Sequence, residues 1–77
     1  MPTVLRIKGY RIGFFSADAD EPPHIHVDKG GGQAKFWLEP LQLANDAGLS
    51  RRELNEVYDI LREHRQELLK KWHEYFR

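Results

Sequence analysis

Two histidines one residue apart are the side chains of this chain best suited to chemistry. They lie in the run EPPHIHV, which extends from Glu21 to Val27. Imidazoles titrate near neutral pH, so two of them on one surface can transfer protons, ligate a metal or bind an anion. The residue types alone leave these three kinds of site open.

Two consecutive prolines precede the pair and predict how the chain presents it. Each proline fixes its own φ and disfavours helix in the residue before it, so we expect a strand to begin at His24. Side chains alternate along a strand. His24, His26 and Asp28 would therefore share one face, while the apolar residues between them point to the core.

A metal-free ribonuclease is one activity that such a face would support. Its reaction needs a base for the 2′-hydroxyl, an acid for the leaving oxygen and cations for the phosphorane. The candidate catalytic residues for these roles are His24, His26, Arg11 and Lys35. Whether any reaction is catalysed stays open at this point.

A metal site and a purely structural role are the alternatives for the histidine pair. The pair supplies two ligands, and a third would have to come from Asp28, His64 or a loop carboxylate such as Asp18. Two ligands do not make a site, so we predict no metal and no cofactor. In the structural alternative the rings stack on Trp37 or hydrogen-bond a loop carboxylate.

The strands and the helix that position these residues are predicted from a change in the spacing of apolar residues along the chain. Short alternating segments broken by turn residues predict about four antiparallel strands, at residues 3–8, 10–15, 24–28 and 33–38. The glycines at 30–32 predict a hairpin turn, because neither GK[ST] nor a helix follows them, as a phosphate loop would require. Residues 39–49 are expected to form a connector, with one further short strand left open.

One long helix is predicted over residues 50–77. Ser50 and Glu53 fit a capping box, and apolar residues then recur at threes and fours. The predicted fold class is α+β: an antiparallel meander of about four strands with one long C-terminal helix packed on one face. We expect residues 1–77 to form a single domain.

The end of this helix carries an aromatic cluster, Trp72, Tyr75 and Phe76. A helix of this length measures about 39 Å, whereas a globule of this size is about 25–30 Å across. The helix should therefore overhang, and its aromatic end is a candidate partner-binding surface. The equal alternative is that these rings cap the end of the sheet.

The sheet face turned away from the helix is predicted to be positively charged and partly aromatic. Its candidate binding residues are Arg6, Lys8, Phe15 and Trp37, in addition to the catalytic candidates above. Four basic groups against the carboxylate of Asp28 give a local balance of three positive charges. Sheets that bind single-stranded RNA combine positive charge for phosphates with aromatic rings for bases. The alternative is that long basic side chains merely keep an open sheet soluble.

Composition narrows the function classes further. Twelve basic residues balance twelve acidic ones, so any binding of nucleic acid must come from a local patch. The absence of cysteine excludes disulfides and thiol catalysis. No apolar run reaches the length of a membrane span or a signal peptide, so we expect a cytoplasmic protein without membrane contact.

Several segments together resemble a known family of short bacterial and archaeal proteins. They are MPTVLRIKGYRIGFFS, EPPHIHV, AKFWL after the glycine turn, GLSRREL and ELLKKWHEYF. The chain is similar in these segments to the family of the domain of unknown function numbered four-one-six-zero. This resemblance implies an association with toxin–antitoxin modules, often beside a second small protein, and implies no particular chemistry.

The leading hypothesis is a toxin-like or RNA-directed component of a two-protein toxin–antitoxin type module. It would act through the histidine face and be held by a small cognate protein partner. RNA and a second copy of the chain are open as further partners. The rival hypothesis is a non-catalytic protein- or metal-binding module whose histidines are structural.

Overall fold

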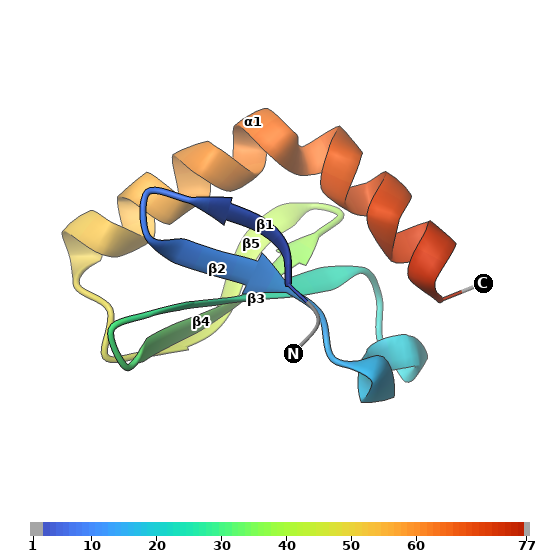
Figure 1. The fold of residues 1–77 in the computed structure, drawn as a ribbon, viewed down its shortest axis with the longest axis horizontal. Helices are drawn as coiled ribbons and strands as arrows, with labels where there is room; N and C mark the ends of the chain where they lie inside the picture. The colour runs from blue at the N-terminus through green and yellow to red at the C-terminus, as the bar shows by residue number, and fades with distance from the viewer. Residues whose placement is uncertain (1–2, 77) are drawn as a thin grey trace.

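One antiparallel sheet and one long helix make up the fold (Figure 1). The structure, a computed structural model, describes residues 3–76, apart from the side chains of residues 17 and 18. The strands are β1 (Thr3–Ile7), β2 (Tyr10–Gly13), β3 (His24–Lys29), β4 (Gly32–Leu38) and β5 (Leu41–Ala47), and a short 3₁₀ helix, η1 (Ser16–Asp20), lies between β2 and β3. The strands pair in chain order, each antiparallel to the next. The predicted α+β meander with one C-terminal helix is confirmed, with five strands where about four were expected.

Two tight turns set the register of the first four strands. Lys8 and Gly9 join β1 to β2, and both have positive φ, 53° and 83°. Lys8 was expected inside the first strand, which is wrong because a two-residue hairpin turn needs positive φ at both positions. Gly30 and Gly31 form the equivalent turn between β3 and β4, so the predicted glycine hairpin is confirmed.

The fifth strand occupies most of the segment that was expected to be a connector. After the Glu39–Pro40 bond, which is cis, β5 runs back along β4 from Leu41 to Ala47. Its pairing supplies hydrogen-bond partners to a strand that would otherwise leave backbone groups unsatisfied at the edge. The pairing shifts by one residue beside Lys35, so β5 contains a bulge at Ala44.

Helix α1 (Arg51–Tyr75) begins at the predicted cap. The Glu53 backbone N–H donates to Ser50 Oγ at 3.0 Å, and the Ser50 N–H donates to Glu53 Oε1 at 2.8 Å. This second bond holds the pKa of Glu53 below its ordinary value. The capping box is therefore confirmed, whereas Arg77, the predicted last residue of the helix, lies outside the described residues. Within residues 3–76 no helix is long and apolar enough to cross a membrane.

The core lies between α1 and one face of the sheet. The helix contributes a buried stripe of Val57, Ile60, Leu61, Leu68, Leu69 and Trp72. The periodicity of the sequence predicts a stripe of Leu54, Val57, Tyr58, Leu61, Leu68, Trp72, Tyr75 and Phe76. This stripe omits the buried Ile60 and Leu69 and includes Tyr58, which is exposed. Arg65 extends from the helix to donate from Nε to the Leu38 carbonyl at 2.6 Å, which ties α1 to the end of β4.

The last turns of α1 bend down past the end of the sheet (Figure 1). A straight helix of this length measures about 37 Å, which exceeds the 34 Å longest dimension of the molecule. Trp72 is only 4% exposed and packs edge-to-face on Phe14 at 5.3 Å between ring centroids. Phe76 is half-buried beside Trp72, whereas Tyr75 is 45% exposed. The helix therefore curves along its length (Figure 1), and Trp72 caps the core.

Candidate functional site

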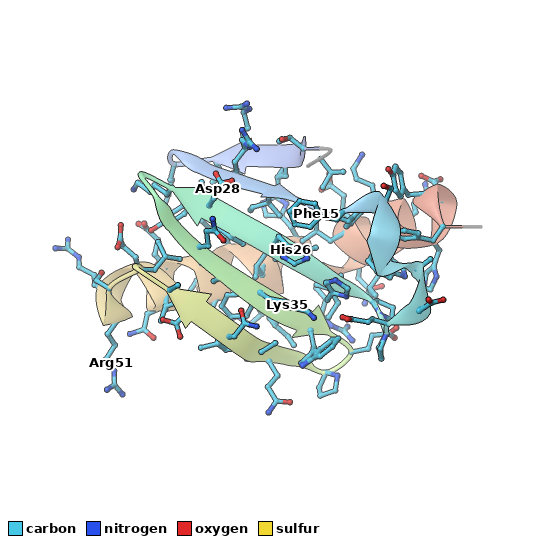
Figure 2. All side chains as sticks on the ribbon, turned by 90° about the horizontal axis from the view of Figure 1, so that it is seen from below. Phe15, His26, Asp28, Lys35 and Arg51 are labelled. Carbon is cyan, nitrogen blue, oxygen red and sulfur yellow. The ribbon has the colours of Figure 1, made fainter. Side chains whose placement is uncertain are left out.

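The sheet face turned away from α1, called the open face below, carries most of the predicted site residues. Strand register decides which of them are neighbours. His26 lies opposite Gly13 on one side and Lys35 on the other, and Asp28 lies opposite Arg11. Figure 2 shows Phe15, His26, Asp28 and Lys35 together on this face.

A pocket of about 360 Å³, called the hollow below, is sunk into the open face over β3, β4 and β5. Its lining consists of an aromatic ring, an imidazole, charged and amide groups, and small residues: Phe15, His26, Val27, Asp28, Gln33, Ala34, Lys35, Asn45, Asp46 and Ala47. The side chains of Val27 and Ala34 are buried and point to the core. Their backbone atoms therefore form the floor of the hollow. The size falls in the range of small-ligand sites.

Phe15 forms the aromatic wall of the hollow. It follows the end of β2 and is 43% exposed. Its ring meets the His26 ring edge-on, at 4.6 Å between centroids and 72° between planes. Gly13 stands opposite His26 on β2 and has no side chain to cover the imidazole. The exposed part of the Phe15 ring can therefore stack on a planar ligand.

His24 is a core residue, although it shares a strand face with His26. Its side chain is 0% exposed, and its ring lies 5.0 Å from that of Trp72 and 5.5 Å from that of Trp37. Nδ1 lies 2.9 Å from the Pro22 carbonyl oxygen and donates to it, since that oxygen only accepts. The two histidine rings are 5.1 Å apart, but only His26 lines the hollow.

Carboxylates accompany two of the predicted cations of the open face. Lys35 Nζ donates to Glu21 Oε1 at 2.6 Å and lies 4.5 Å above the Trp37 ring. Arg11 Nη2 lies 3.6 Å from Asp28 Oδ2. The predicted balance of three positive charges is therefore too high, because Glu21 adds a carboxylate and Lys8 lies in a turn. Arg6, Arg11 and Lys35 against Asp28 and Glu21 leave a balance of one.

The remaining predicted binding residues lie around the hollow. Arg6 is exposed on β1 opposite Arg11, and Trp37 is half-buried beneath Lys35. The hollow is also lined by Gln33, Asn45 and Asp46, which were not among the predicted site residues. Asn45 and Asp46 are on β5. The alternation of Leu41 and Leu43 with polar residues is the sequence pattern that could have indicated this strand.

No group of three His, Asp or Glu side chains is placed to hold a metal ion in the part of the chain that the structure describes. His64 is on α1, where its Nδ1 lies 3.4 Å from Glu67 Oε1. The side chain of Asp18, the loop ligand considered above, lies outside the described residues. The described part of the histidine face therefore gives no support to a metal site.

A buried tyrosine on the helix side of the sheet has a strongly shifted pKa. Tyr10 donates its hydroxyl to Glu56 Oε1 at 2.8 Å, and Lys29 Nζ lies 4.5 Å above its ring. Burial, assisted by the bond to Glu56, raises the pKa of Tyr10 to about 12. This group stabilises the sheet–helix interface and does not face the hollow.

The chain was compared with protein-family models, curated proteins and solved structures. Neither the curated proteins nor the solved structures gave a match. One family model matches residues 9–73, a span that includes the hollow, the histidine pair and most of α1. The chain therefore belongs to the family described as the domain of unknown function DUF4160.

Proposed function

We propose that this protein is the RNA-directed component of a two-protein toxin–antitoxin type module and that it binds single-stranded RNA in the hollow. The observation that carries the proposal is the exposed ring of Phe15 beside a polar pocket on an otherwise open sheet. A flat ring next to polar groups is the arrangement by which sheets take up unstacked bases.

Stacking supplies the larger part of the binding energy in this proposal. A base stacked on an aromatic side chain contributes about 1–3 kcal/mol. The open face has a local balance of only one positive charge, so phosphate attraction is moderate. Arg6 and Arg11 lie on β1 and β2, on the far side of Asp28 from β4, where a bound strand would continue past the hollow.

Binding is favoured over histidine catalysis because of where His24 lies. A two-histidine ribonuclease needs both imidazoles at the scissile phosphate, and His24 is 0% exposed and donates to the Pro22 carbonyl. His26 is the imidazole that lines the hollow. The second candidate, a non-catalytic binding module with structural histidines, draws its support from the same burial of His24.

Fluorescence anisotropy with a labelled single-stranded RNA tests the binding. Phe15→Ala is expected to weaken the affinity about tenfold or more, since it removes the stacking wall. Arg51→Ala is the matched control, because Arg51 is exposed at the start of α1 and lies away from the hollow (Figure 2). Equal affinities of the wild type and Phe15→Ala, or no binding by either, would contradict the proposal.

Bacterial growth after induction of this protein, in a strain that lacks the gene for the second small protein, tests the toxin-like role. The wild type is expected to arrest growth, and the Phe15→Ala variant is not. Total-RNA integrity in the same cultures separates binding from cleavage. Unaffected growth with both proteins would reject the toxin-like role and leave the non-catalytic module.

A further inference from the structure

We infer that the hollow selects guanine among the RNA bases and that Asp28 is the residue that selects it. This inference rests on the proposed RNA binding and adds the base specificity of the same site. It follows from the position of the Asp28 carboxylate inside a pocket whose lining also includes a stacking ring, an imidazole, a lysine, a second aspartate and two amide side chains.

The Asp28 carboxylate is held in place and is still accessible. It lies on β3 opposite Arg11, whose Nη2 is 3.6 Å away, a distance too long for a hydrogen bond. The interaction is therefore a charge pair and does not occupy the hydrogen-bonding lone pairs of Asp28. Its side chain is 39% exposed, so a base in the hollow can reach it.

An ionised carboxylate discriminates among bases because it only accepts hydrogen bonds. Guanine presents two adjacent donors, N1–H and the N2 amino group, which fit the two oxygens of one carboxylate. Adenine and cytosine each place a ring-nitrogen acceptor beside their amino donor, and uracil flanks its single N–H with two carbonyls. Each of these three would bring an acceptor against Asp28.

Donors for the remaining edge of guanine lie on the other side of the hollow. Gln33 is directly opposite Asp28 on β4, and Asn45 follows on β5 opposite Lys35. Both amide side chains are exposed and line the hollow, so either can donate to the O6 carbonyl of the base. Phe15 then supplies the stacking surface.

The same carboxylate keeps the RNA backbone out of the hollow. A phosphate placed beside Asp28 would be repelled, because both groups are anionic. The base therefore enters and the phosphates stay outside, toward the exposed Arg6 on β1. This arrangement separates base selection from phosphate attraction, which is the usual division in nucleic-acid recognition.

Anisotropy with four RNAs of the form UUUNUUU tests the inference, where N is G, A, C or U. The RNA with guanine is expected to bind about tenfold more tightly than the other three, the scale of one good bidentate contact. Inosine at the same position lacks the N2 amino group and is expected to lose most of this advantage. This comparison uses the wild-type protein and needs no variant to fold.

Asp28→Asn provides the second arm, since it keeps the size of the side chain and adds a donor. It is expected to bring the four affinities within about threefold of one another. Asp59→Asn is the matched control, because Asp59 is an exposed carboxylate on α1 and lies outside the hollow. Equal affinities for all four RNAs with the wild type would overturn the guanine inference alone. Absence of binding to every RNA would overturn the proposed function as well.

Discussion

At the scale of single residues, the two histidines of one strand face have different environments. Alternation along β3 correctly predicts that His24 and His26 share a face. It does not predict that His24 is buried, because the ring that covers it, Trp72, comes from the last turns of α1. Burial at a sheet end depends on tertiary packing between segments that are far apart in sequence.

Replacing the two histidines should therefore have unequal effects on stability. His24→Ala removes a buried ring and its bond to Pro22, which should cost about 2–4 kcal/mol of unfolding free energy. His26→Ala should cost no more than about 1 kcal/mol, because His26 is half-exposed. Urea denaturation of both variants measures this difference. Equal losses in the two variants would contradict the structural role of His24.

Because its pKa is raised in the folded state, Tyr10 should lower the free energy of unfolding at alkaline pH. Its folded-state pKa of about 12 lies above the unfolded value of about 10. The contribution of Tyr10 is therefore complete below pH 10 and is lost as the pH rises toward 12. Unfolding free energies at pH 8 and pH 11 should differ more in the wild type than in Tyr10→Phe. The exposed Tyr58 and Tyr75 are present in both proteins and serve as the internal control. An identical pH dependence in the two proteins would contradict the raised pKa of Tyr10.

At the scale of elements, local signals predicted the glycine turn and the helix start but left β5 undecided. The paired prolines, the glycine run and the Ser50–Glu53 cap each act through neighbouring residues, so the sequence suffices for them. The strand β5 is almost wholly exposed, and its residues lack the buried apolar alternation that identifies a strand. Its formation depends on pairing with β4, and part of the lining of the hollow comes from β5.

The close approach of Gly32 and Gly48 provides a test of this pairing. A Cβ on Gly32 would lie 2.8 Å from the Gly48 carbonyl oxygen and 2.7 Å from Leu49 Cδ2. Gly32→Ala should therefore destabilise the protein by about 1–3 kcal/mol, because backbone must shift. Gly30→Asn is the control, since Gly30 has open space around it and asparagine tolerates its φ of 56°. Thermal melts compare the two variants, and a Gly32→Ala protein as stable as the control would show that the junction is looser than described.

At the scale of the whole molecule, the composition gives a net charge of zero. The strand pattern of the sequence, however, overestimated the positive charge of the open face. Twelve basic and twelve acidic residues are present, and the sequence alone could not show that Glu21 reaches Lys35. That contact crosses from the loop before β3 to β4. The open face is therefore closer to a stacking surface than to an electrostatic one.

This weak charge predicts a shallow salt dependence for RNA binding. Three cations, Arg6, Arg11 and Lys35, lie on the open face, and each released counterion on single-stranded RNA contributes a slope of about −0.7. A plot of the logarithm of the binding constant against the logarithm of the salt concentration should therefore have a slope no steeper than about −2. Anisotropy titrations at several salt concentrations measure it. A slope steeper than about −4 would indicate phosphate binding elsewhere on the molecule.

The most direct test of the central claim is an NMR titration of the ¹⁵N-labelled protein with a single-stranded RNA that contains guanine. If RNA binds in the hollow, the amide chemical shifts of the residues around it are expected to change, namely those of Phe15, His26, Asp28 and Asn45. The exposed side of α1, represented by Asp59 and Arg62, should stay unchanged and provides the control within the same spectra. Shifts confined to α1, or an unchanged spectrum at a large excess of RNA, would contradict the assignment of the open face as the RNA-binding site.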